Sequence, residues 1–143
     1  ENGASLLGEP HEKLKITYII EYIHPLIGRQ ELSLDINRET FKKEIAPART
    51  FGFLKDAEIL RKKKLALGSS LDNTIVLDDH KVINPPLRFK DEFVRHKILD
   101  LMGDLSLLKG NLSGHFRAEK AGHRLHLQAV RFLLENKEFL EIK

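Results

Sequence analysis

Three polar side chains in residues 91–108 recur at every fourth position. His96, Asp100 and Asp104 follow this spacing, which places them along one side of a helix with a drift of about 40° per step. An imidazole nitrogen and a carboxylate oxygen one turn apart can bind the same ion, and this pair is a common half of a catalytic zinc site. Every surface helix also carries a polar stripe, so the spacing alone leaves both interpretations open.

A second candidate segment is residues 120–123, KAGH, where a predicted strand passes into a predicted helix. If protonated, His123 could donate a proton to a leaving group. A histidine at the start of a helix is also common without any chemistry. No spacing singles out the remaining histidines, for which we expect surface or core roles: His11, His24, His80, His115 and His126.

The polar stripe requires a helix that turns it away from the core. We predict that helix over residues 91–108, with Asp91 as its N-cap. Gly103 lies beside the stripe, where a glycine costs about 1 kcal/mol relative to alanine and lets another group approach closely. The opposite side would pack on a sheet because apolar residues cluster there: Val94, Ile98, Leu101, Met102 and Leu105.

The other predicted elements complete a mixed fold. Dense β-branched residues predict a strand over residues 14–23, and alternating polarity predicts its hairpin partner over residues 31–36. We further predict helices over 39–46, 57–64 (capped by Asp56) and 123–136, strands over 74–77 and 111–120, and loops over 48–53 and 67–73. These elements predict an α+β fold, a two-layer sandwich of a mostly antiparallel sheet packed against helices, with a small inserted subregion.

Composition narrows the class of protein. The 143 residues suit one domain, and 41% hydrophobic residues suffice for a core. The net charge of +3 is only a weak indication of a polyanionic partner. Because there is no cysteine, a metal would need His and carboxylate ligands. The lack of cysteine is also compatible with a protein of a reducing compartment. We expect no membrane span and no secretory leader, and we expect the chain to be a processed or excised piece.

Motifs of several common enzyme classes are absent from the sequence. It contains no GxGxxG, no Gly-rich GK[ST] loop, no GxSxG and no HExxH. Dinucleotide-binding, P-loop, α/β-hydrolase and common zincin interpretations therefore lose their main support.

Four segments resemble one known family in their order and spacing. They are residues 48–53 (ARTFGF), 67–73 (LGSSLDN), 87–105 (LRFKDEFVRHKILDLMGDL) and 120–123 (KAGH). Together they resemble LpxC, the UDP-3-O-acyl-N-acetylglucosamine deacetylase family of lipid A biosynthesis. The likeness extends over about residues 14–134 and corresponds to the second of the family's two similar α+β domains, which hold a zinc site between them.

The resemblance implies a division of the chain. Residues 14–143 would be the C-terminal deacetylase domain, and residues 1–13 a linker or tail. Residues 53–76 would match an insert that encloses the substrate's acyl chain, with these candidate lining residues: Leu54, Leu65, Leu67 and Ile75. The sequence departs from the family pattern at Ser69, at Glu119 and over residues 124–127, where we expect effects on helix packing and on the acyl passage.

The resemblance also implies roles for individual residues. His96 and Asp100 would bind the zinc cofactor, while the missing first domain would supply a third ligand, a histidine, and a glutamate general base. Thr50 would hydrogen-bond the developing oxyanion. His123, held cationic by Asp104, would protonate the leaving amine.

Three further residues match positions that bind the substrate, UDP-3-O-acyl-N-acetylglucosamine. Lys97 and Lys120 would pair with its diphosphate, and Phe51 would offer a ring to the nucleotide end. The family's reaction is cytoplasmic, and we expect this chain to be inactive without the first domain.

Two other function classes stay open. A basic α+β domain could bind nucleic acid, although the Lys and Arg residues are dispersed and no aromatic residues interleave with them. The chain could also be a non-catalytic remnant that binds a sugar nucleotide or a protein partner. We favour the deacetylase and expect no nucleic-acid partner.

Overall fold

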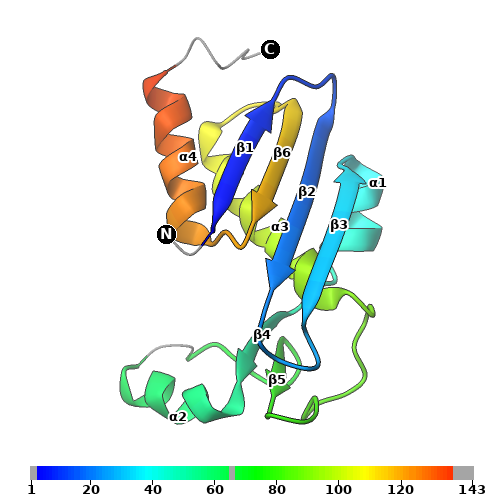
Figure 1. Cartoon of the computed structure of the whole chain (residues 1–143), viewed down its shortest axis with the longest axis vertical. Helices are drawn as coiled ribbons and strands as arrows, with labels where there is room; N and C mark the ends of the chain where they lie inside the picture. The colour runs from blue at the N-terminus through cyan, green and yellow to red at the C-terminus, as the bar shows by residue number, and fades with distance from the viewer. Residues whose placement is uncertain (1–2, 65–66, 137–143) are drawn as a thin grey trace.

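The computed structural model describes residues 3–64 and 67–136. Its main part is a four-stranded sheet with the order β1-β6-β2-β3 (Figure 1). Strand β6 is antiparallel to β1 and parallel to β2, and β2 forms an antiparallel hairpin with β3. Most pairings in this sheet are antiparallel, as predicted. The strand bounds are Ser5–Glu9 for β1, Leu14–Glu21 for β2, Arg29–Asp35 for β3 and Gly114–Glu119 for β6.

Helices α3 (Glu92–Leu105) and α4 (His123–Glu135) cover one face of this sheet (Figure 1). Helix α3 contacts β2, β3 and α4, while α4 also contacts β1. The predicted α+β sandwich of a sheet packed against helices is therefore confirmed. Helix α1 (Arg38–Thr40) continues into a π-helical turn at Phe41–Ile45, and a 3-10 turn at Ser106–Leu108 follows α3. No helix in the described ranges is long and apolar enough to cross a membrane.

A smaller unit lies beyond the turn that joins β2 to β3 (Figure 1). It contains the parallel strands β4 (Thr50–Phe53) and β5 (Thr74–Leu77), with helix α2 (Leu54–Lys62) between them in the sequence. The prediction of a loop over residues 48–53 is wrong for its last four positions. Their pairing partner is β5, which local patterning does not reveal.

The core forms where β2 and β6 meet α3. Ile16, Tyr18 and Ile20 of β2 alternate toward the helices, because successive strand side chains point to opposite faces. The apolar side of α3 meets them as predicted, with four fully or nearly fully buried residues: Val94, Ile98, Leu101 and Leu105. This packing leaves the opposite side of α3 for the polar stripe.

Three local predictions differ from the structure. Residues 1–13 include the edge strand β1, whose mostly exposed side chains lack the alternation of a half-buried strand. Asp91 occupies the N-cap position of α3, but its carboxylate accepts from Nε of Arg95 at 2.6 Å instead of capping a backbone N–H. Asp56 lies inside α2, because that helix begins at Leu54.

A substitution at Gly103 tests whether the polar side of α3 is open at this position. A Cβ at this position would meet no heavy atom within 4 Å. We expect Gly103→Ala to raise the free energy of unfolding by about 0.5–1 kcal/mol, because alanine has the higher helix propensity. Urea denaturation of the chain measures this change.

The matched control is Gly114→Ala. Gly114 has a φ of +136°, and a Cβ there would lie 3.3 Å from the carbonyl oxygen of Glu9, so this variant should lose stability. A loss of stability in Gly103→Ala as well would show that the exposed side of α3 is not open at Gly103.

Candidate functional site

His96 and Asp100 project from adjacent turns of α3 and meet. Nε2 of His96 lies 3.2 Å from Oδ1 of Asp100, and the side chains are 15% and 16% exposed. Nδ1 of His96 lies 3.2 Å from the carbonyl oxygen of Ala48. Both ring nitrogens thus face oxygen atoms that accept hydrogen bonds. In the neutral form of the ring, which has one N–H, only one of these two contacts can be a hydrogen bond.

A cation bound by Nε2 and Oδ1 would satisfy both atoms. Two ligands of a tetrahedral zinc ion, each about 2.0–2.2 Å from the metal, lie about 3.3–3.6 Å apart. The two ligand atoms of His96 and Asp100 are 3.2 Å apart. Metal-binding histidines are usually oriented by donating their other N–H to a carbonyl or carboxylate, and Nδ1 of His96 faces the carbonyl of Ala48. The donor pair therefore fits zinc.

Lys97 contacts the same carboxylate. Its Nζ donates to Oδ2 of Asp100 at 2.7 Å. Burial alone would raise the pKa of Asp100, but hydrogen bonds from His96 and Lys97 outweigh burial and hold that pKa well below its usual range. Asp100 is therefore anionic at neutral pH, the state in which a carboxylate binds a cation.

Asp104 joins α3 to two histidines of α4. Its Oδ2 accepts from Nδ1 of His123 at 2.7 Å and from Nδ1 of His126 at 2.8 Å. Nε2 of His123 lies 3.8 Å from Oδ1 of Asp100, so His123 stands beside both carboxylates of the stripe. Candidate ligand atoms of Asp104 and the two histidines lie within 4.8 Å of one another. Their contacts describe a hydrogen-bonded network centred on Oδ2.

Sequence reasoning expected only a surface or core role for His126. The available signal was its spacing of three residues from His123, which places both side chains on one side of a helix. The structure shows that His126 is fully buried and contacts the Tyr18 hydroxyl, 3.0 Å from its Nε2.

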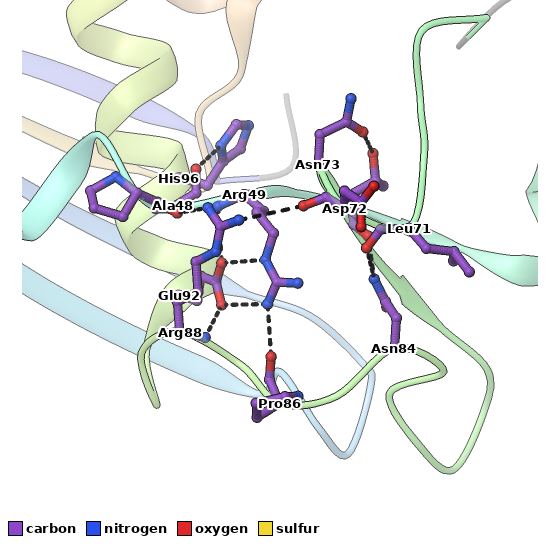
Figure 2. Close-up of polar contacts among 12 residues, drawn as sticks. Ala48, Arg49, Leu71, Asp72, Asn73, Asn84, Pro86, Arg88, Glu92 and His96 are labelled. Carbon is purple, nitrogen blue, oxygen red and sulfur yellow. Dashed lines mark hydrogen bonds and ion pairs between the residues drawn. The ribbon is translucent and has the colours of Figure 1, made fainter.

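A buried carboxylate connects the start of α3 to the chain that enters β4 (Figure 2). Glu92 is fully buried and accepts from the backbone N, Nε and Nη2 of Arg49 at 2.9–3.1 Å. The backbone N–H of Arg88 donates to the same carboxylate at 2.6 Å. Burial would raise the pKa of Glu92, but these hydrogen bonds lower it overall. Sequence reasoning missed this contact, because nothing in the local pattern pairs Glu92 with Arg49.

Thr50 and His96 line the same pocket, which has a volume of about 430 Å³. The pocket also includes residues of the loop that precedes β5, and Arg88 bridges its two sides by donating to the carbonyls of Pro47 and Asp72 (Figure 2). A larger cavity of about 580 Å³ lies near the other end of α3, and none of its lining residues is a histidine. The smaller pocket is therefore the one that contains candidate site residues, Thr50 and His96.

The predicted substrate residues Phe51 and Lys120 contact other residues. The Phe51 ring is half-buried and packs edge-on against Tyr22 and Phe93, with centroid distances of 5.6 and 5.1 Å. Lys120 forms an ion pair with Glu21 and has a left-handed backbone conformation with a φ of 49°. Within the described ranges, no hydrogen bond or ion pair joins either residue to the His96 and Asp100 pair.

The candidate lining residues of the acyl insert differ in burial. Ile75 is a fully buried core residue, whereas Leu54 and Leu67 are exposed. Leu65 lies outside the described residues. The role of the insert stays a prediction.

Comparison with known proteins identifies the family. The model of the family described as LpxC, UDP-3-O-acyl N-acetylglycosamine deacetylase, matches residues 1–135. The chain belongs to the LpxC family. Proteins named UDP-3-O-acyl-N-acetylglucosamine deacetylase are 53% identical over 135 residues in Thermodesulfovibrio yellowstonii and 54% identical over 136 residues in Nitratidesulfovibrio vulgaris. A protein of the same name from Coxiella burnetii is 47% identical over 145 residues.

The chain spans about half the length of these curated relatives. The alignments cover 94% of this chain but only 46% and 44% of the first two relatives. For the Coxiella burnetii protein, the shares are 99% and 48%.

The Glu92 contact predicts how stability depends on pH. Because folding lowers the pKa of Glu92, its stabilising contribution is present above the unfolded value of about 4.3 and is lost as the pH falls through the lower folded value. Glu92→Gln should reduce the free energy of unfolding at pH 7 by about 3 kcal/mol, since it leaves buried Arg49 without a charged partner. It should also flatten the decline in stability below about pH 4.5.

Urea denaturation at a series of pH values measures both effects. The control is Glu39→Gln, which removes an exposed ion pair with Lys43 and should change stability by less than about 0.5 kcal/mol. Equal effects of the two substitutions would contradict the role given to Glu92.

Proposed function

We propose that this chain is the second half of a zinc-dependent N-deacetylase of lipid A biosynthesis. The substrate would be UDP-3-O-acyl-N-acetylglucosamine, whose N-acetyl amide is hydrolysed. The 3.2 Å approach of Nε2 of His96 to Oδ1 of Asp100 carries the proposal, because it suits two ligands of one zinc ion. The deacetylase names of the relatives support the reaction class and the substrate.

The zinc site would be completed by a partner. His96 and Asp100 would bind the ion, and a histidine from the first half would be the third ligand. The first half would also supply a glutamate as general base. When bound, zinc would polarise the amide carbonyl and lower the pKa of a water molecule toward about 7. The absence of cysteine accords with carboxylate and imidazole ligands, and with the cytoplasm as the proposed location.

Two residues of this chain would then donate hydrogen bonds or protons as the amide bond breaks. Water adds to the amide carbon, and the Thr50 hydroxyl donates to the oxygen that becomes negative. The carbon–nitrogen bond breaks, releasing acetate and the sugar amine, and His123 gives the amine a proton. Nδ1 of His123 donates to Asp104, so Nε2 is the atom available to carry that proton.

Lys97 and Lys120 would bind the diphosphate, and Phe51 would contact the nucleotide end. Each lysine already has a carboxylate partner, Asp100 or Glu21, for which a phosphate would have to compete. The hydrogen bond to Glu21 raises the pKa of Lys120, so this residue stays cationic at neutral pH. Residues 53–76 would enclose the acyl chain.

Zinc binding tests the proposed ligands. We expect the 143-residue chain to bind zinc weakly and to lack appreciable deacetylase activity, because it supplies only two of the proposed protein ligands. His96→Ala should weaken zinc binding further. The control, His80→Ala, replaces an exposed histidine in the turn after β5 and should not. Calorimetric titration measures these affinities, and a tight one-to-one site in the unchanged chain would overturn the proposed division of the ligands.

Activity after reconstitution tests the reaction. When the first half of the family's protein is supplied in trans, we expect deacetylation of the sugar nucleotide. Thr50→Val should lower kcat by a factor on the order of 10²–10³, as removal of an oxyanion donor does in other hydrolases. Thr40→Val, at the end of α1, is the matched control and should leave kcat unchanged. Failure of two soluble, folded halves to release acetate would refute the assigned roles.

A further inference from the structure

His126 of α4 is fully buried, and each of its ring nitrogens has a polar partner. Nδ1 lies 2.8 Å from Oδ2 of Asp104 on α3, and Nε2 lies 3.0 Å from the hydroxyl oxygen of Tyr18 on β2. The Tyr18 hydroxyl also lies 2.8 Å from the carbonyl oxygen of Ala121, which it can reach as a donor. One imidazole therefore links the central strand to the carboxylate that accepts from His123.

These partners determine where the proton of His126 lies. Burial lowers the pKa of His126, so the ring is neutral near pH 7 and carries one N–H. An ionised carboxylate only accepts, which places this proton on Nδ1, facing Asp104. Burial raises the pKa of Tyr18, so its hydroxyl keeps the proton that it shares between Nε2 and the Ala121 carbonyl.

The two histidines differ in how firmly they can hold Asp104. Both donate to the same oxygen, Oδ2, and their rings meet edge to face with centroids 5.9 Å apart. His123 is 61% exposed, whereas the side chain of His126 is 0% exposed and is also fixed by Tyr18. Water competes for the hydrogen bonds of an exposed ring, so a buried ring with two partners is better able to fix the orientation of a carboxylate.

We propose that His126 is a positioning residue for the proton donor of this site. Its Nδ1–H holds Asp104 in the orientation that accepts from Nδ1 of His123, and so keeps Nε2 of His123 as the atom that takes up and releases a proton. His126 does not touch the substrate in this proposal. The inference rests on the proposed function, which makes His123 the acid for the leaving amine.

Two substitutions separate this role from a merely structural one. In His126→Asn, the amide nitrogen can take the place of Nδ1 and still donate to Asp104, but the contact with Tyr18 is lost. In His126→Gln, the longer side chain puts its terminal amide where Nε2 lay. The amide oxygen can accept from the Tyr18 hydroxyl as Nε2 does, and the donor to Asp104 is removed. Both variants lose the ring, so a structural role predicts similar effects.

Nitrogen-15 NMR of the histidine rings in the 143-residue chain reads the proton positions directly. In the unchanged chain, we expect Nδ1 to be protonated in neutral His126 and neutral His123. His126→Asn should preserve this form of His123, whereas His126→Gln should shift His123 toward the tautomer mixture of a free imidazole. Finding Nε2 as the only protonated nitrogen of His126 would overturn the proposal, whether or not the variants fold.

Kinetics of the reconstituted enzyme provide the second measurement. His126→Gln should lower kcat by about tenfold or more with KM unchanged, because Asp104 loses a hydrogen-bond donor that orients it. The kcat of His126→Asn should stay within about twofold of that of the unchanged protein. Equal losses in the two variants would overturn the proposal. If the unchanged reconstituted protein is inactive, the proposed function fails, and the NMR measurement still decides the position of the proton.

Discussion

The buried carboxylate of Glu92 determines how the parts of the candidate site meet. Because this carboxylate is fully buried, it needs the donors that Arg49 and Arg88 supply. Those donors belong to the chain entering β4 and to the loop before α3, and both are drawn to the first turn of the helix. Thr50 follows Arg49, and His96 lies one turn beyond Glu92. Their shared pocket is a direct consequence of this contact.

The later turns of α3 are fixed by a different polar contact. Asp104 accepts from two histidines of α4, one exposed and one buried against Tyr18. Helix α3 is therefore attached to the small unit at its start and to α4 near its end, while its apolar side is buried against the sheet. Between these attachments, Nε2 of His96 and Oδ1 of Asp100 lie 3.2 Å apart.

The exposure of two residues with proposed catalytic roles fits the proposal of a site shared between two halves. Thr50 and His123 are exposed, although hydrolytic chemistry benefits from exclusion of bulk water. A partner that covers the polar side of α3 would exclude this water and strengthen the electrostatic contacts. The chain's span of about half of its LpxC relatives agrees with this arrangement.

The sequence by itself determined the features that depend on neighbouring residues. These are the apolar and polar sides of α3, the β2–β3 hairpin, the α+β class and the meeting of His96 with Asp100 one turn apart. Only the tertiary structure decided that Ser5–Glu9 and Thr50–Phe53 are strands, that Glu92 is bound by Arg49 and that His126 contacts Asp104. The physical reason is that periodicity encodes which side of an element is buried, whereas a buried polar group or an edge strand takes its hydrogen-bond partners from distant parts of the chain.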